Sequence, residues 1–215
     1  GTGFSLPKPV LGYHPGTFLE RGASVPFTTP HLNGARARPA PQGLGLDSAL
    51  VRQRMVQRLR AEGIRCEPVF AAMGQVPRHH FVDTALAIQA YEDTSLPIGH
   101  GQTISKPSVV ARMIELLFDG GSAREAGHLG RALEVGTGCG YQTALLAQLA
   151  RRVVSIERLR PLFDKAQANL AAWRLDHVRL VFGDGMLGHP PNAPYDSLIA
   201  AAGGDELPAS WLDQL

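Results

Sequence analysis

Several features that would mark common classes of protein are scarce in this sequence. Only two of the 215 residues are cysteine, Cys66 and Cys139, which is too few for a disulfide framework or a four-ligand zinc site. No stretch approaches the roughly 20 consecutive apolar residues of a membrane-spanning helix, and the first residues lack a charged start followed by an apolar run. With 21 basic and 19 acidic residues, the net charge of +2 cannot supply a strong phosphate-neutralising surface. These absences favour a protein of the reducing cytoplasm that holds no metal and binds neither membranes nor nucleic acid.

The composition divides the chain into two parts. Residues 1–46 contain seven of the 16 prolines and eight of the 24 glycines, and no hydrophobic period of 2 or 3.6 residues runs through them. We interpret this segment as a basic, proline- and glycine-rich extension. The chain as a whole is 44% hydrophobic, which is enough for residues 47–215 to bury the core of one domain.

The hydrophobic pattern of residues 47–215 predicts helices first, and then strands that alternate with helices. The first helices are expected from Asp47 to Gly63, over Glu67–Met73, around Ala85–Ala90 and after Pro107. Four short apolar runs then predict strands over Ala132–Val135, Val153–Glu157, Val178–Phe182 and Tyr195–Ala201, with helices near Tyr141–Ala150 and Pro161–Trp173 between them. The sequence therefore predicts an α/β fold with a doubly wound, mostly parallel, Rossmann-like sheet and an N-terminal helical lead-in.

A glycine-rich loop follows the first predicted strand, at the end where parallel sheets bind their ligands. Gly136, Gly138 and Gly140 let the backbone turn tightly and approach a ligand, and the next helix would present its N–H groups there. A tight turn without any ligand would contain the same glycines. The dinucleotide fingerprint requires a further glycine where this chain has Tyr141, so an NAD-dependent oxidoreductase is disfavoured.

The ends of the next two predicted strands carry acidic residues. Glu157 lies 21 residues beyond Gly136, where a carboxylate can accept hydrogen bonds from both hydroxyls of a ribose. Asp184 stands between two glycines and can accept a hydrogen bond from an exocyclic amine such as that of adenine. Together they specify a nucleoside without a pyrophosphate, which fits S-adenosyl-L-methionine. Glu134, just before the loop, is a candidate for the ammonium group of that ligand, or else for packing or capping.

Three segments of the chain carry a resemblance to a known family. They are Val76–Val82, Leu96–Pro107 and Leu133–Ala144. From Asp47 to Leu215 the chain resembles the protein-L-isoaspartate (D-aspartate) O-methyltransferases, a family that uses S-adenosyl-L-methionine, and the second segment is specific to that family. Cys139 stands where serine is common in the family, and Ala201–Gly204 replaces its usual turn. We also expect the family's last three strands to be missing, which would leave the fourth strand with an open edge.

The resemblance implies a repair enzyme. It implies methylation of the free α-carboxylate of L-isoaspartyl and D-aspartyl residues in damaged proteins, after which a succinimide re-forms and partly opens to normal aspartate. It also implies a cytoplasmic monomer and gives Ser105 the catalytic role. The expected cofactor-binding residues, from the strand ends and the resemblance together, are Gln102, Thr103, Ile104, Glu134, Gly136, Thr137, Gly138, Gly140, Glu157, Asp184 and Gly185.

The chemistry of methyl transfer limits what Ser105 has to do. A sulfonium methyl group is already electrophilic and a carboxylate is ionised at neutral pH, so orientation matters more than a strong base. A hydroxyl that donates to one carboxylate oxygen would suffice. Serine two residues before Pro107 and an apolar helical run is also typical of a helix N-cap, and the two roles are compatible. Asp93 is open to two interpretations, a residue that lines the site or a solvated acid, and the second is favoured. We interpret His79 as a surface or loop residue.

Two other functions stay open at this point, a methyltransferase of small-molecule carboxylates and a non-catalytic module that binds S-adenosyl-L-methionine. Methyltransferases of nucleic-acid bases are disfavoured. The chain lacks an Asn-Pro-Pro-Tyr type of motif after the fourth predicted strand, and neither cysteine is placed to attack cytosine.

Overall fold

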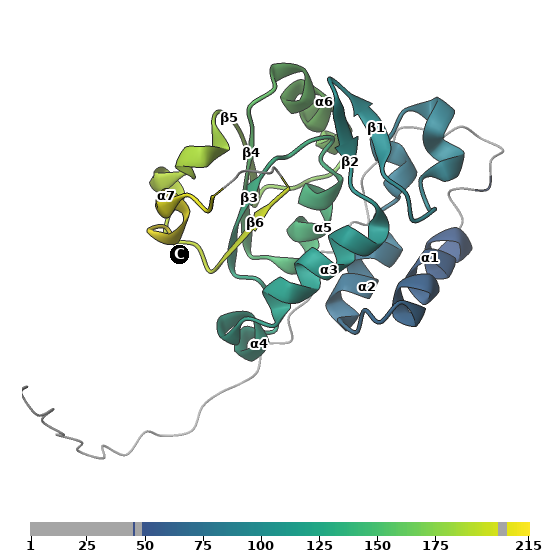
Figure 1. Cartoon of the computed structure of the whole chain (residues 1–215), viewed down its shortest axis with the longest axis horizontal. Coiled ribbons are helices and arrows are strands. Elements are labelled where there is room, and N and C mark those ends of the chain that lie inside the picture. The colour runs from purple at the N-terminus through teal and green to yellow at the C-terminus, as the bar shows by residue number, and fades with distance from the viewer. Residues whose placement is uncertain (1–44, 46–48, 202–205) are drawn as a thin grey trace, which may run out of the picture.

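The structure is a computed structural model that describes residues 45, 49–201 and 206–215 (Figure 1). The expected extension over residues 1–46 lies outside these described residues, apart from Gly45, and so do residues 202–205. Within the described ranges, no helix is long and apolar enough to cross a membrane.

Four parallel strands form the central sheet, in the order β5-β4-β3-β6. They are β3 (Arg131–Val135), β4 (Arg152–Glu157), β5 (Val178–Phe182) and β6 (Ser197–Ala200). The parallel α/β sheet predicted from the sequence is thereby confirmed. The chain runs from β3 to β5 at one edge and then returns to place β6 on the other side of β3. The strand order therefore reverses beside β3, which is where open α/β sheets bind their ligands.

Each face of the sheet is covered differently. On one face, α5 (Tyr141–Leu149) joins β3 to β4, α6 (Arg160–Leu170) joins β4 to β5, and α3 (Pro107–Phe118) packs against β6. On the other face lies the short α7 (Ala209–Leu212), whose Trp211 packs with Tyr195 and with apolar side chains of β3 and β4 (Figure 1). Because both faces of these central strands are covered, their sequences are mostly apolar rather than alternating.

The N-terminal lead-in is helical, as predicted. It consists of α1 (Ala49–Ala61), α2 (Glu67–Gln75) and two 3-10 turns over Arg78–Phe81 and Thr84–Gln89, and α4 (Gly121–Ala126) follows α3. Helix α2 packs on α5, so α5 is enclosed between the lead-in and the sheet. This position explains why nearly every residue of α5 is buried and why the helix has no polar face toward solvent.

The segment before α3 forms a hairpin, although the hydrophobic pattern predicts no strand there. Strand β1 (Leu96–Gly99) pairs antiparallel with β2 (Gln102–Ile104). The turn between them contains three consecutive residues with positive φ, which Gly99 and Gly101 adopt easily on either side of His100. The two strands are too short to display the alternation that identifies a strand in sequence.

The start of α3 differs from what the sequence predicts for Ser105. Lys106 occupies the N-cap position, and its side chain makes no capping hydrogen bond. Asp93 anchors the helix instead, because its carboxylate accepts hydrogen bonds from the backbone N and the Oγ of Ser108, both at 2.8 Å, and lies 3.5 Å from Lys106 Nζ. The interpretations of Ser105 as the N-cap and of Asp93 as a solvated acid are therefore wrong.

Substitution of Asp93 tests this anchor. Burial acts to raise the pKa of Asp93, but the hydrogen bonds from Ser108 and the charge of Lys106 outweigh it and hold the pKa below its usual value. The carboxylate therefore stabilises the fold above its ordinary pKa, and this stabilisation is lost as the pH falls through the lowered pKa. At pH 7, Asp93→Ala should lower the free energy of unfolding by about 1–2 kcal/mol in urea denaturation. Ser108→Ala, which keeps the backbone hydrogen bond, should lower it less, and equal stability of Asp93→Ala and wild type would contradict the account.

Candidate active site

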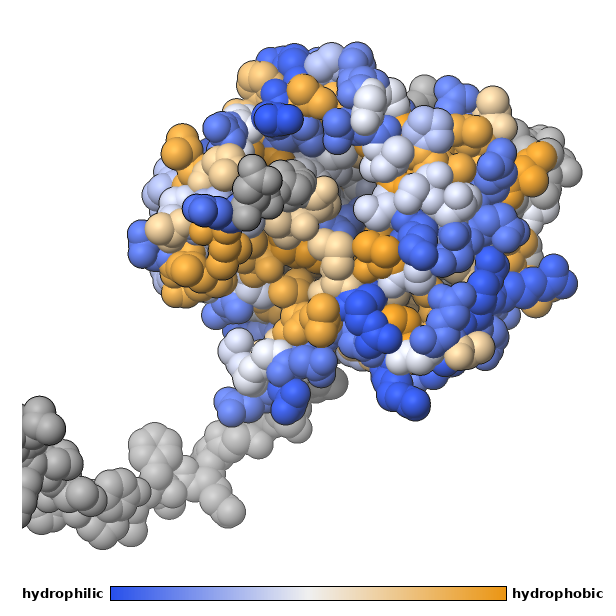
Figure 2. All heavy atoms as spheres, in the orientation of Figure 1, coloured by the Kyte–Doolittle hydropathy of each residue, from blue (hydrophilic) through white to orange (hydrophobic). Residues whose placement is uncertain are grey.

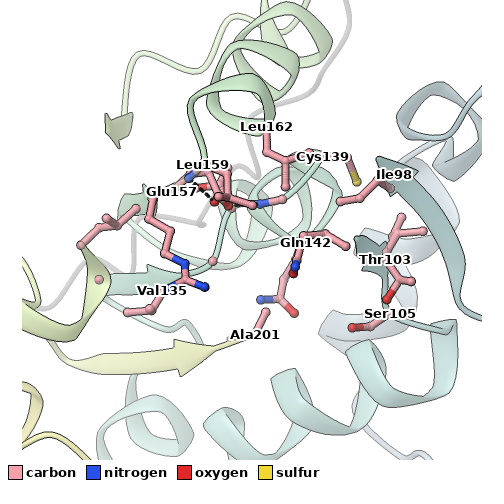
Figure 3. A pocket seen from close by; sticks show the side chains of 18 of the residues that line it. Ile98, Thr103, Ser105, Val135, Cys139, Gln142, Glu157, Leu159, Leu162 and Ala201 are labelled. Carbon is pink, nitrogen blue, oxygen red and sulfur yellow. Dashed lines mark hydrogen bonds between the residues drawn. The ribbon is translucent and has the colours of Figure 1, made fainter. Parts of the chain in front are cut away.

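A pocket of about 550 Å³ opens at the carboxyl ends of the parallel strands (Figure 3). Its wall combines the ends of β3 and β4, the turn after β5 and the β1–β2 hairpin. Ten of the residues predicted from the sequence line it: Gln102, Thr103, Ile104, Ser105, Gly136, Thr137, Gly138, Glu157, Asp184 and Gly185. Glu134 and Gly140 belong to the same predicted set and do not line the pocket.

Glu157 holds the glycine-rich loop against the end of β4. Its Oε2 accepts a hydrogen bond from Gly138 N and its Oε1 accepts one from Leu159 N, both at 2.9 Å (Figure 3). The side chain is only 6% exposed, yet it lines the pocket. Each carboxylate oxygen can accept a second hydrogen bond, so Glu157 can support the loop and still bind a ligand hydroxyl.

The turn after β5 brings a second acid to the pocket. Asp184 is exposed, and its Oδ1 accepts a hydrogen bond from Met186 N at 3.0 Å at the start of a 3-10 turn. Gly185 lets this turn pack closely on β3, because a Cβ there would lie 2.4 Å from Val135 Cγ1. The carboxylate of Asp184 therefore reaches the pocket from a turn that packs directly on the central strand.

Glu134 is buried beneath the pocket rather than in its wall. It is 0% exposed and accepts hydrogen bonds from Gln142 Nε2 at 3.0 Å, Thr143 Oγ1 at 2.5 Å and Ser155 Oγ at 2.6 Å. Burial raises the pKa of Glu134 to about 7, with the hydrogen bonds acting in the opposite direction and the charge of Glu157 adding to the rise. Of the two roles open from the sequence, this geometry matches the structural one. Glu134 joins β3, β4 and the first turn of α5.

Gly140 likewise supports the loop rather than the pocket surface. It is the N-cap residue of α5, with φ of 90°. A Cβ at this position would lie 3.1 Å from Leu170 Cδ1, so the glycine lets the start of α5 pack closely against α6.

The hairpin carries Ser105 to the opposite side of the pocket from Glu157 and Leu159 (Figure 3). Ser105 is half-buried, and its hydroxyl makes no hydrogen bond within the described part of the chain. Its backbone carbonyl is held, however, because it accepts a hydrogen bond from Arg78 Nη2 at 2.7 Å. The serine thus has a fixed backbone and a hydroxyl that is available to a ligand.

Several pocket residues were not identified from the sequence. Gln142 lines the pocket while its amide donates to Glu134, and its place one residue after Tyr141 in the first turn of α5 is a signal that could have revealed it. Ile98 and Leu162 form apolar parts of the wall, and no local pattern distinguishes them from core residues. The surface interpretation of His79 is wrong, because this side chain is buried and its Nδ1 lies 2.7 Å from the Tyr91 hydroxyl.

The chemistry of the wall fits a polar, partly cationic ligand of small size. Among the described residues, the charged groups that line it are the acidic Glu157, Asp184 and Glu206 and the basic Arg158. No group of three or more metal-ligating side chains occurs among the residues that the structure describes.

The mouth of the pocket is apolar on one side. Met186 and Leu207 line the pocket and are 47% and 62% exposed. Figure 2 shows apolar side chains gathered on the face that carries α7, and Leu187, Leu212 and Leu215 of this region are also exposed. A ligand larger than the pocket would therefore meet apolar surface where it leaves the mouth.

The chain is similar to proteins of one known family. The family model described as "Protein-L-isoaspartate(D-aspartate) O-methyltransferase (PCMT)" matches residues 50–215. A protein-L-isoaspartate O-methyltransferase of Methylibium petroleiphilum is 68% identical over 175 residues, covering 81% of this chain and 64% of the relative. One of Leptothrix cholodnii is 63% identical over 182 residues, covering 83% and 62%. The chain thus spans just under two thirds of the length of these relatives.

Solved structures share the fold. A structure of a protein-L-isoaspartate O-methyltransferase is 28% identical, with a TM-score of 0.65 over 76% of this chain and 52% of that chain. A structure described as a putative enzyme of this kind from Plasmodium falciparum, in complex with S-adenosyl-L-homocysteine, has a TM-score of 0.62 at 23% identity, over 76% of this chain and 79% of that chain.

The buried carboxylate of Glu134 makes a testable contribution to pH-dependent stability. Its raised pKa means that the folded chain binds this proton more tightly than the unfolded chain, so the stabilisation is complete below about pH 4.5 and is lost as the pH rises through about 7. Between about pH 5 and 8, wild type should lose on the order of 2 kcal/mol more stability than Glu134→Gln, measured by urea denaturation. Glu62→Gln, at an exposed glutamate, is the control. Parallel pH profiles of wild type and Glu134→Gln would contradict this expectation.

Proposed function

Because the chain belongs to the protein-L-isoaspartate(D-aspartate) O-methyltransferase family, we propose that it is a repair enzyme that methylates damaged proteins. It transfers the methyl group of S-adenosyl-L-methionine to the free α-carboxylate of L-isoaspartyl and D-aspartyl residues. The observation that carries this proposal is the placement of Ser105 across one pocket from Glu157 and the glycine-rich loop. The Ser105 hydroxyl and the strand ends that would bind the nucleoside then face the same pocket.

The residues of the strand ends fit S-adenosyl-L-methionine. Glu157 retains acceptor capacity for the ribose hydroxyls, and the exposed carboxylate of Asp184 can accept from the adenine amine. Gly136, Thr137 and Gly138 bring the backbone close to the remainder of the cofactor. When bound, the cofactor supplies an electrophilic methyl group. Glu134 contributes indirectly, because it fixes Gln142 in the pocket wall.

Ser105 orients the substrate. The hydroxyl donates a hydrogen bond to one oxygen of the substrate carboxylate, which leaves the other oxygen free to attack the methyl carbon. An O–C bond forms while the S–C bond breaks, and the products are a methyl ester and S-adenosyl-L-homocysteine. No proton has to move. The apolar mouth near Met186 and Leu207 accepts the neighbouring residues of a peptide, which favours a protein substrate over a small carboxylate.

The remaining assignments follow from the family and the composition. We propose a catalytic domain over residues 47–215 behind an extension over residues 1–46, which is supported by the start of the family match at residue 50. The protein acts as a cytoplasmic monomer on isoaspartyl-containing proteins and peptides, without nucleic acid or membrane partners. The small net charge supports the absence of nucleic-acid and membrane partners.

Transfer of labelled methyl groups to paired peptides tests the proposed function. Two synthetic peptides that differ only in an isoaspartyl or an aspartyl linkage are incubated with the protein and labelled S-adenosyl-L-methionine. We expect label in the isoaspartyl peptide alone. Binding of S-adenosyl-L-homocysteine without transfer to either peptide would contradict the repair function and leave a binding module or a small-molecule enzyme.

Substitution of Ser105 tests its role in orientation. Ser105→Ala should lower kcat on the order of 100-fold, because a preorganised donor is lost, while the Kd for S-adenosyl-L-homocysteine stays within about twofold. Ser95→Ala, at an exposed serine beside the other end of the hairpin, is the matched control and should match wild type. Unchanged kcat in a folded Ser105→Ala variant would rule out the role.

A further inference from the structure

Arg78 is a buried cation that no local sequence pattern marks. It lies in the 3-10 turn over Arg78–Phe81 and is 0% exposed. No carboxylate among the described residues forms an ion pair with it. Burial lowers the pKa of its guanidinium, although an arginine stays charged at neutral pH. A buried charge without a counterion is costly, so its position calls for a functional explanation.

The guanidinium joins the two ends of the segment that carries the hairpin. Its Nε donates to Ala90 O at 2.8 Å and its Nη2 donates to Ser105 O at 2.7 Å. Residues 91–104, with both hairpin strands, lie between these two carbonyls. The planar fork of a guanidinium holds two carbonyls in one preorganised geometry. The backbone of Ser105 is therefore fixed by Arg78 directly.

The same guanidinium also contacts the other half of the site. Its Cζ lies 4.8 Å from the centre of the Tyr141 ring, and Tyr141 lines the pocket as the first residue of α5. The Nη1 of Arg78 is buried and has no hydrogen-bond partner in the described part of the chain. Arg78 thus connects the serine hairpin to the helix after the glycine-rich loop, and no carboxylate of the described residues pairs with its positive charge.

We propose that Arg78 is a positioning residue for methyl transfer, which fixes Ser105 through its fork and favours an anionic substrate through its charge. This inference rests on the proposed function and names the group that prepares the site for a carboxylate. The substrate carboxylate supplies the negative charge that the buried guanidinium lacks. Nothing else among the described residues combines these two properties beside Ser105.

The two contributions act on different kinetic constants. Methyl transfer neutralises the carboxylate, so a nearby positive charge stabilises the bound substrate more than the transition state and lowers KM. Fixing the Ser105 backbone holds the carboxylate in line for attack, which raises kcat. A lysine at position 78 would keep the charge but would lack the planar fork that holds both carbonyls in one geometry, whereas a methionine would lose both properties.

Kinetics of Arg78→Lys and Arg78→Met with the isoaspartyl peptide separate these contributions. We expect Arg78→Lys to lower kcat about tenfold with KM within about twofold, because only the geometry is lost. Arg78→Met should lower kcat similarly and raise KM about tenfold as well, because the charge is lost. Arg58→Met is the matched control, since Arg58 also donates to a carbonyl of this segment, Tyr91 O at 3.1 Å, but does not contact Ser105. It should match wild type in both constants.

Titration with S-adenosyl-L-homocysteine counts the folded sites, so that a loss of folded protein is not mistaken for a loss of activity. Wild-type kcat and KM in both Arg78 variants would overturn the proposal. So would an equal rise of KM in Arg78→Lys and Arg78→Met. If wild type itself does not methylate the isoaspartyl peptide, the proposed function fails, which is a different result from active wild type with unaffected variants.

A measurement on wild type keeps the proposal testable if both variants fail to fold. The Nε–H resonance of Arg78, assigned through its own side chain in ¹⁵N-labelled protein saturated with S-adenosyl-L-homocysteine, should shift on addition of the isoaspartyl peptide. The aspartyl peptide should leave it unchanged. An Arg78 resonance that does not shift at a saturating concentration of the isoaspartyl peptide would overturn the inference.

Discussion

The parallel register of β3 and β4 is the constraint on which the rest of the site depends. Val135 pairs with Ile156 at the ends of these strands, so the loop after one strand lies beside the last residue of the other. Glu157 can therefore accept a hydrogen bond from Gly138 N. Beneath this contact, the buried Glu134 joins both strands to α5 through hydroxyl and amide donors. The shape of the pocket at these strand ends therefore follows from backbone pairing and from the two carboxylates.

The other half of the site comes from a segment that precedes the sheet in sequence. The β1–β2 hairpin has little pairing of its own, and side chains from outside hold its ends. Arg78 holds the carbonyls of Ala90 and Ser105, and Asp93 holds the start of α3. Among the described residues, none makes a hydrogen bond with the Ser105 hydroxyl, which leaves it available for the orienting role that we propose.

Much of this architecture could be predicted from the sequence, because strands buried on both faces and loops rich in glycine have strong local patterns. The strand ends Gly136, Glu157 and Asp184 were identifiable because parallel topology brings successive strand ends together. Features that depend on contacts between distant segments could not be predicted from local patterns. The N-cap prediction for Ser105 failed because Asp93, 15 residues before Ser108, anchors the helix instead. Likewise, nothing local to Arg78 indicates that its guanidinium reaches Ser105.

The most direct test of the account is a crystal structure of the protein with S-adenosyl-L-homocysteine and an isoaspartyl peptide. The account predicts the ribose hydroxyls on Glu157 and one oxygen of the peptide carboxylate about 2.5–3.0 Å from Ser105 Oγ. The other oxygen should face the sulfur of the product. A carboxylate held by other groups, with Ser105 turned away from it, would contradict the account.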